Sequence, residues 1–167
     1  MKKGSAFVFF VELFTNEVLI VPIFAWLIAQ VLKTLINSLV NGKLTLERMV
    51  GDGGMPSAHT ATVVSLMLMC GFTAGWGSTL FALSAIFAVV VMHDATGVRQ
   101  ETGKQAVVIL DMIKVMQEYF WEKDSAAKAE KLKIFVGHSK WQVFCGMILG
   151  VIIVLVYWFL IRPLFVG

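Results

Sequence analysis

Charged residues are scarce in this sequence. Of its 167 residues only 15% are charged and 58% are hydrophobic, and the mean hydropathy is +0.81. Soluble domains are usually about a quarter charged. The composition therefore argues against an ordinary soluble domain and indicates a chain whose solvent is the bilayer.

Cysteine is also scarce. The two cysteines, Cys70 and Cys145, lie inside apolar runs without a CxxC or Cys–His spacing. This pattern argues against a disulfide or a zinc site and predicts that both are small packing residues. Glycine, proline and serine are scattered without forming a linker or a repeat, so residues 1–167 are expected to form one domain.

The sequence contains several long apolar runs. A spanning helix needs about 20 mostly apolar residues. Four runs meet this length: Val18 to Val40, Ser57 to Gly75, Ser78 to Val98 and Trp141 to Phe165. The expected fold class is all-α, an integral membrane helical bundle with about four transmembrane helices.

Two further segments predict helices that do not span. Phe7 to Leu13 is apolar but is interrupted by Glu12 and soon followed by Glu17, which favours an uncleaved interfacial helix over a signal peptide. After the third span, Lys104 to Glu118 carries charges at helical spacing along one side, which predicts an amphipathic helix in the membrane interface. The mixed charges of Trp121 to Lys133 predict a solvated helical turn or two.

The positive charges predict the orientation. Four spans place the loops 41–56 and 99–140 on one side of the membrane. That side carries ten of the fourteen Lys and Arg residues, namely Lys43, Arg48, Arg99, Lys104, Lys114, Lys123, Lys128, Lys131, Lys133 and Lys140. The positive-inside rule makes it the cytoplasmic side.

The segment Gly53 to Thr60 predicts an anion site at the start of the second span. Pro56 is suited to the first turn of a helix, so the helix is expected to begin there with its N–H groups and positive dipole end toward an anion. Gly53 and Gly54 allow close approach of a phosphate, and Ser57 adds a hydroxyl donor. His59 can donate a proton. The alternative is a flexible loop with an incidental histidine.

Acidic and basic residues gather where the third span ends. If that helix continues, Asp94, Glu101 and Gln105 share one face. A carboxylate at the end of a span is costly unless it is paired or functional. Arg99 and Lys104 are available to pair with these carboxylates. A structural ion-pair network is therefore an alternative to a functional role for the acidic residues.

Two more segments carry polar residues toward the same side. Gln30, Lys33, Thr34 and Asn37 form a stripe on the first span, which favours a Lys33 that faces the bundle over one that reaches to the surface. Gly137 to Gln142 precedes the fourth span and contains His138. Two histidines at one membrane face suggest a nucleophile and an acid for phosphoryl transfer.

Together these residues resemble the divergent branch of the type-2 phosphatidic acid phosphatase family, which is related to acid phosphatases and vanadium haloperoxidases. The matching motifs are similar to GGMPSSHSA, DAxGVR with GxQA, and GHTPxEV. They correspond to Gly53 to Ala61, Asp94 to Arg99 with Gly103 to Ala106, and Gly137 to Val143.

The resemblance implies roles for three residues. By similarity to the parent phosphatases, His59 would protonate the leaving group, His138 would attack phosphorus, and Lys33 would bind phosphate. Position 142 departs from the pattern, because Gln142 stands where the divergent branch usually has Glu and the parent family Asp. A neutral Gln can accept a hydrogen bond from the imidazole but cannot stabilise its cation. Either Asp94 or Glu101 would substitute for it, or the chain would be a poor catalyst.

The expected activity is hydrolysis of a phosphorylated lipid at the cytoplasmic leaflet, in a bacterial plasma membrane. Phosphatidic acid, phosphatidylglycerophosphate and polyprenyl phosphate or diphosphate are the substrate classes considered. No cofactor is needed by a histidine mechanism. One alternative is a magnesium-dependent phosphatase that uses Asp94 and Glu101, and another is a non-catalytic lipid-phosphate binder or transporter. No nucleic-acid partner is expected, and homo-oligomer formation stays open.

Overall fold

A computed structural model describes residues 3–42, 54–120 and 139–166, with the side chains of a few helix-end residues and of Arg99 left out. The described residues form helices and no strand, so the predicted all-α class is confirmed. In chain order the helices are α1 (Lys3–Thr15), α2 (Glu17–Asn41), α3 (Ala58–Ala74), α4 (Thr79–Thr96), α5 (Val98–Phe120), α7 (Lys140–Val156) and α8 (Pro163–Val166), with a π-helical segment Tyr157–Ile161 between the last two.

Polar caps determine where these helices begin. The Asn16 Oδ1 accepts the N–H groups of Val18 and Leu19 at 3.0 and 3.3 Å, so α2 starts at Glu17. Ser78 caps α4 through the N–H of Phe81 at 3.1 Å. Such caps satisfy N–H groups that have no hydrogen-bond partner within the helix. In lipid these groups need a partner from the protein, because no water is there to accept their hydrogen bonds.

The predicted spans are confirmed in part. The stretches Glu17–Val40, Thr79–Met116 and Lys140–Phe165 are long and apolar enough to cross a membrane. The second predicted span, Ser57 to Gly75, corresponds to α3, which is apolar but has only 17 residues. Among the described residues, length and composition therefore establish three helices that can span a membrane. The predicted number of four is not confirmed.

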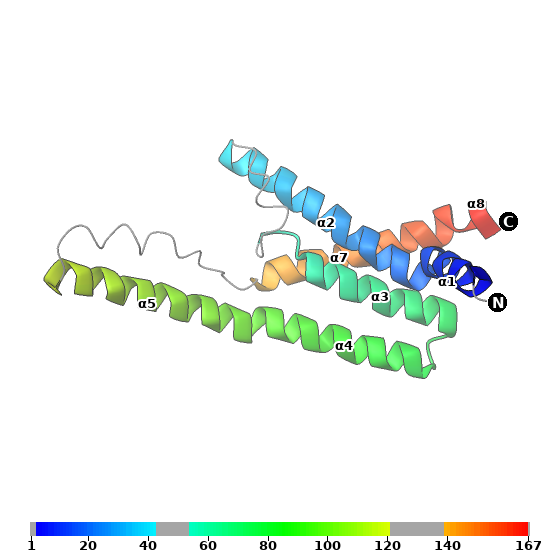
Figure 1. Cartoon of the computed structure of the whole chain (residues 1–167). Helices are drawn as coiled ribbons and strands as arrows, with labels where there is room; N and C mark the ends of the chain where they lie inside the picture. Colours follow the sequence, from blue (N-terminus) through cyan, green and yellow to red (C-terminus); the bar gives the residue numbers. More distant parts are fainter. Residues whose placement is uncertain (1–2, 43–53, 121–138, 167) are drawn as a thin grey trace.

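The short helix α3 is the centre of the bundle. It packs against α2, α4 and α7, and Figure 1 shows it between these helices. Small and polar residues on α3 are fully buried, including Ala61, Thr60 and Ser65. Because its neighbours cover it, α3 tolerates polar side chains that a lipid-facing helix would not.

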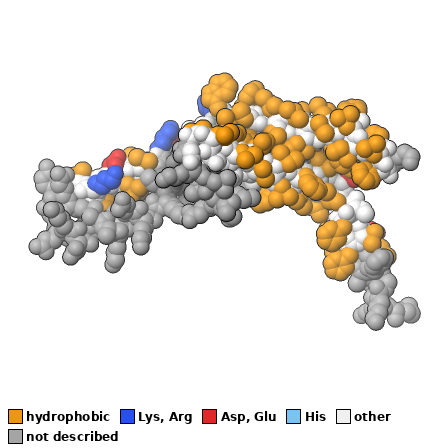
Figure 2. Space-filling view, turned by 90° about the horizontal axis from the view of Figure 1, so that it is seen from above, with side chains coloured by type: hydrophobic (Ala, Val, Ile, Leu, Met, Phe, Trp, Pro, Cys, Tyr) orange, Lys and Arg blue, Asp and Glu red, His pale blue; other side chains and the backbone are white. Residues whose placement is uncertain are grey.

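Hydrophobic side chains cover the outside of the bundle. Leu83, Ile86 and Phe87 on α4 are more than half exposed, and similar residues cover the outer faces of α2 and α7. Figure 2 shows this apolar surface, with the visible Lys and Arg side chains toward the end where α5 continues. An exposed apolar surface of this extent is expected for a protein that lies in lipid.

The third span ends differently from the prediction. The helix stops at Thr96 instead of Val98, and Gly97, with φ −104° and ψ −94°, separates α4 from α5. The α5 helix then continues roughly along α4 and extends beyond the bundle (Figure 1). The predicted amphipathic helix is thus present, and its place relative to the membrane remains a prediction. The Trp121 to Lys133 segment lies outside the described residues.

An ion pair and aromatic rings join the helices at the opposite end. The Arg162 Nε lies 2.9 Å from the Glu17 Oε2, which links the start of α2 to the segment after α7. The Arg162 guanidinium lies 4.4 Å from the centroid of the Trp158 ring, and that ring stacks on Phe72 of α3 at 4.8 Å. These contacts hold α2, α3 and the segment after α7 together.

The predicted orientation can be tested with single cysteines in a variant whose Cys70 and Cys145 are replaced by alanine. Gly77→Cys lies in the exposed α3–α4 turn, where an added Cβ meets no atom within 4 Å, and Lys114→Cys lies on the exposed surface of α5. In intact cells a membrane-impermeant maleimide should label Gly77→Cys at once and Lys114→Cys only after permeabilisation. The reverse pattern would contradict a cytoplasmic site.

Candidate active site

The polar segments singled out in the sequence meet at one end of the bundle. The last turns of α2 and α4 lie toward the end of the bundle at which α3 and α7 begin, and α2 extends beyond these starts (Figure 1). Lys33 near the end of α2, Asp94 in the last turn of α4 and Gln142 in the first turn of α7 therefore share one end with Gly54. Gly53 and His138 lie outside the described residues.

The closest contact at this end joins the starts of α3 and α7. The Ser57 N–H donates to the Gln142 carbonyl at 3.0 Å. A Cβ added at Gly146 would lie 2.5 Å from the Ser57 carbonyl oxygen, and one added at Gly150 would lie 2.7 Å from that of Ala61. The two glycines, four residues apart, allow the backbones to approach in the way that small residues do in membrane helix pairs.

A side chain reinforces this contact one turn further along. The Ser65 hydroxyl of α3 donates to the Gly150 carbonyl of α7 at 3.3 Å, and Ser65 is fully buried. Interhelical hydrogen bonds of this kind satisfy polar groups that have no access to water. The register of α3 against α7 is thus defined at three successive points from Ser57 onward.

The start of α3 corrects one detail of the sequence analysis. The helix begins at Ala58, with Ser57 as its N-cap, and not at Pro56. The Ser57 Oγ accepts the Thr60 N–H at 3.4 Å and the Thr60 hydroxyl at 3.1 Å, and Ser57 is fully buried. Its hydroxyl therefore serves the helix start, because a side-chain acceptor at this position satisfies the first N–H groups.

The start of α7 is a capping box. The Ser139 Oγ accepts the Gln142 N–H at 3.3 Å, and the Gln142 Oε1 accepts the Ser139 N–H at 3.0 Å. This reciprocal pair is the S/T-x-x-E/Q arrangement, in which Gln and Glu are both suited to the last position. Gln142 thus has a structural role that the sequence analysis did not assign to it.

The polar stripe of α2 faces the interior of the bundle. Gln30, Lys33 and Thr34 are between 5% and 7% exposed, which agrees with the prediction that Lys33 faces inward. The Thr34 hydroxyl donates to the Gln30 carbonyl at 2.9 Å. The Gln30 Oε1 is buried and has no hydrogen-bond partner within the described part of the chain.

Lys33 and Gly54 are in direct contact. Gly54 has a φ of +96°, which favours glycine, and a Cβ placed there would lie 2.9 Å from the Lys33 Cγ and 3.0 Å from its Cδ. The absence of a side chain at Gly54 therefore lets the aliphatic part of Lys33 pack on the backbone just before α3. The lysine is held beside the loop that the sequence predicts to be an anion site.

The remaining predicted residues of α3 and α4 occupy accessible positions. His59 is exposed in the first turn of α3, and Asp94 is half-buried in the last turn of α4. Each makes interactions with its surroundings. The imidazole of His59 is therefore accessible at the end of the bundle where α7 also begins.

The charged residues of α5 form local pairs. The Lys104 Nζ lies 2.7 Å from the Glu101 Oε1, and both side chains are exposed. Gln105 is exposed as well, and the Arg99 side chain lies outside the described part. Exposed pairs of this kind contribute little to stability, about 0 to 1 kcal/mol.

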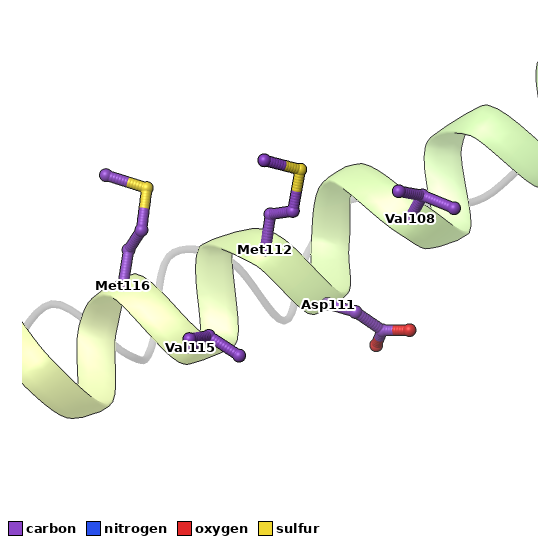
Figure 3. Close-up of a pocket in the computed structure, with 5 residues that line it drawn as sticks. All are labelled: Val108, Asp111, Met112, Val115 and Met116. Atoms are coloured by element: carbon purple, nitrogen blue, oxygen red, sulfur yellow. The ribbon is translucent and has the colours of Figure 1, made fainter.

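A shallow hollow lies on the surface of α5. Within the described chain its lining comes from α5 alone: Val108, Asp111, Met112, Val115 and Met116. Figure 3 shows Met112 and Met116 on one side of the helix and the Asp111 carboxylate directed away from them. One helix cannot enclose a ligand, so we place the candidate site at the helix starts instead.

The described side chains do not gather into a metal-binding group. Among residues 3–42, 54–120 and 139–166, no three His, Cys, Asp or Glu side chains lie close enough together to hold an ion. Of the two carboxylates considered for magnesium, Glu101 is paired with Lys104.

The comparison with protein families agrees with this arrangement of motifs. Residues 14–153 match the model of the divergent PAP2 family. The chain belongs to the divergent PAP2 family. This match confirms the family that the three motifs resembled.

A curated relative supports the same assignment. The chain is 40% identical over 151 residues to the uncharacterized membrane protein YuiD of Bacillus subtilis (strain 168), and the match covers 87% of this chain and 96% of the relative. No solved structure matches the chain. The protein is thus a membrane member of the divergent PAP2 family over most of its length.

Several residues of the site were missed by sequence reasoning. Gly146 and Gly150 form a small-xxx-small pattern within the fourth span, which signals close helix packing in membranes. The Ser139-x-x-Gln142 spacing signals a capping box. Both signals were present in the sequence, and neither identifies the partner helix.

Gly146→Ala should destabilise the contact between α3 and α7. The added methyl group would lie 2.5 Å from the Ser57 carbonyl oxygen, so the helices must separate. Overpacking of this kind typically costs about 1–3 kcal/mol, and the thermal unfolding midpoint of the purified protein in detergent should fall. Gly77→Ala is the control, because its Cβ meets no atom within 4 Å. Equal midpoints for the two variants would contradict this packing.

Proposed function

We propose that the protein is a membrane phosphatase that hydrolyses the phosphate of a phosphorylated lipid at the cytoplasmic leaflet. The observation that carries the proposal is the pairing of the starts of α3 and α7 through the Ser57–Gln142 backbone hydrogen bond. His59 belongs to the first turn of α3, and in the sequence His138 directly precedes Ser139, the N-cap of α7. Membership of the divergent PAP2 family supports phosphatase-related chemistry.

Phosphate binding is assigned to the loop before α3 and to the polar stripe of α2. The α3 N-terminus presents backbone N–H groups and the positive end of the helix dipole. Lys33, which packs on Gly54, adds a cationic side chain from the neighbouring helix. We leave Ser57 out of this group because its oxygen caps the helix. Two further phosphate contacts are proposed from the sequence alone: Gly53, which belongs to the same loop, and Arg99, whose positive charge would add to the site.

The proposed chemistry is a double displacement at phosphorus. An imidazole nitrogen of His138 forms a bond to phosphorus while the bond from phosphorus to the lipid oxygen breaks, and His59 gives its proton to that oxygen. Water then attacks the phosphohistidine, with His59 accepting the proton, and the P–N bond breaks to release phosphate. Both histidines return to their starting states.

Gln142 is expected to permit this chemistry without assisting it. In the capping box its amide oxygen accepts the Ser139 N–H, and a glutamate would make the same bond. Glutamate would also add a negative charge near the helix start, where the dipole favours it. That charge would stabilise a cationic His138.

Histidine variants test the mechanism. His138→Ala should abolish phosphate release, and His59→Ala should lower the rate by about 10²–10⁴, the usual contribution of a general acid. His93→Ala is the matched control, because His93 is an exposed histidine at the same end of the bundle but outside the three motifs. The measurements are phosphate release and trapping of acid-labile phosphohistidine. Full activity of His138→Ala would eliminate the histidine mechanism.

The Gln142 variants test the cap and the missing charge separately. Gln142→Glu should preserve the unfolding midpoint and preserve or raise turnover. Gln142→Ala removes the side-chain acceptor for the Ser139 N–H, so it should cost about 0.5–2 kcal/mol of stability, as N-terminal caps do. A loss of turnover in Gln142→Glu at unchanged stability would argue against a cationic His138 intermediate.

Substrate and metal dependence can be compared in one assay. The purified protein is given phosphatidic acid, phosphatidylglycerophosphate or undecaprenyl diphosphate, each with and without a chelator. The proposal expects chelator-resistant phosphate release from at least one of them. A strict magnesium requirement that persists in His138→Ala would favour the carboxylate–metal mechanism with Asp94 and Glu101. Binding without turnover would favour the binder or transporter.

A further inference from the structure

The helices α4 and α5 together are longer than a membrane is thick. The stretch Thr79–Met116 has 38 residues, which extend over about 57 Å at 1.5 Å per residue. The hydrocarbon core measures about 30 Å, and the tilt of spanning helices, up to about 40°, does not make up the difference. Counted from Thr79, about 20 residues cross the core and reach Val98, just after the joint between α4 and α5. Most of α5 therefore lies outside the hydrocarbon core.

Gly97 is the joint at which the helix can change direction. Its φ of −104° and ψ of −94° lie outside the α-helical region. The Gly97 N–H still donates to the His93 carbonyl at 2.8 Å, and its own carbonyl accepts the Glu101 N–H at 3.0 Å. A Cβ at this position would lie 3.0 Å from the His93 carbonyl oxygen, so glycine suits the joint. The two helices are thus not one continuous rod, although α5 runs roughly along α4 (Figure 1).

One broad face of α5 is apolar. Among the described helices, α5 contacts chiefly α4. Five apolar side chains are between 49% and 60% exposed, namely those of Val108, Ile109, Met112, Val115 and Met116. At 3.6 residues per turn, the apolar side chains from Val115 round to Leu110 occupy about 220° of the helix circumference over residues 106–116. In water such a face would be unfavourable, because apolar surface is stabilised by leaving water.

The charged side chains of the same segment lie on the opposite strip of the helix. Asp111 and Lys114 fall within about 60° of each other, with Val107 between them. The Lys114 Nζ lies 3.7 Å from the Asp111 Oδ1, and both side chains are exposed. Figure 3 shows Met112 and Met116 on one side and the Asp111 carboxylate directed away from them. A wide apolar face opposite a narrow charged strip is the division expected of a helix that lies on a lipid surface.

A lipid surface fits this face better than a second copy of the chain does. The seam of a two-stranded helix pair uses two of every seven positions, so one partner helix would cover only part of a face about 220° wide. The lipid surface is also adjacent. The helix α4, to which α5 is joined at Gly97, presents Ile86 and Phe87 on the outside of the bundle, where lipid is expected. The apolar face of α5 therefore continues a surface that already lies against the bilayer.

We propose that in the membrane α5 turns away from the axis of α4 at Gly97 and docks along the bilayer surface, with Met112, Val115 and Met116 in lipid and Asp111 and Lys114 toward water. The sequence predicts an interfacial helix, and the structure adds the joint, the docking face and the direction of the turn. Glu101, Lys104 and Gln105 precede this face in the chain, so docking holds them at the level of the lipid head groups. The inference does not depend on the proposed hydrolysis.

Spin labels on the two sides of α5 test the docking face. Met112→Cys and Val115→Cys are compared with Asp111→Cys and Lys114→Cys in the full-length protein without Cys70 and Cys145, reconstituted in vesicles of phosphatidylcholine and phosphatidylglycerol. All four positions are exposed, so the labels should leave the fold intact. Collisions with oxygen, which enters lipid, should predominate at 112 and 115, and collisions with a water-soluble nickel chelate at 111 and 114. Predominant nickel collisions at all four positions, or protection of 112 and 115 from both reagents, would overturn the docking.

A distance measurement tests the turn at Gly97. Spin labels are attached to Gly77→Cys, in the turn before α4, and to Met116→Cys, near the end of α5, and their separation is measured by pulsed electron resonance in the same vesicles. A straight helix would place the two positions about 58 Å apart, and a right-angled turn at Gly97 about 41 Å apart. The shorter separation is expected. A separation near that of the straight helix would overturn the proposal, whatever the result for phosphate release.

Discussion

The close contact between α3 and α7 is the constraint on which the rest of this structure depends. A backbone hydrogen bond from Ser57 to Gln142 and the missing side chains of Gly146 and Gly150 bring two helix starts together. In lipid, apolar side chains gain little by leaving the solvent, so helices associate through close packing and interhelical hydrogen bonds. The two histidine motifs lie at these helix starts, and a contact made for packing therefore also determines where the chemistry would take place.

The central position of α3 explains its composition. A helix of 17 residues that carries Thr60 and Ser65 would be poorly suited to face lipid. Here α2, α4 and α7 surround it, and the Ser65 hydroxyl finds a carbonyl on α7. These surrounding helices present the exposed apolar surface in its place. Polar groups are thus concentrated inside the bundle, where the Lys33 side chain and the start of α3 define the candidate site.

Several polar residues at this end have structural roles that limit their use in chemistry. Ser57 and Gln142 both complete helix caps, and Glu101 is paired with Lys104. Removing such residues would change both stability and activity, so a loss of turnover alone would not identify a catalytic group. His59 differs from them, because it is exposed in the first turn of α3. Lys33 differs as well, because its stem packs on a glycine backbone.

The sequence by itself determined the membrane class, the approximate extent of the helices and the family. These properties follow from local signals: the length of apolar runs, the capping residues and short motifs with defined spacing. Only the tertiary structure decided that α3 is central, that Gly146 meets Ser57 and that Lys33 packs on Gly54. Hydropathy is nearly uniform around a buried membrane helix, so it does not identify the neighbouring helix. That choice depends on the fit between small residues on different helices, which is a property of the assembled bundle.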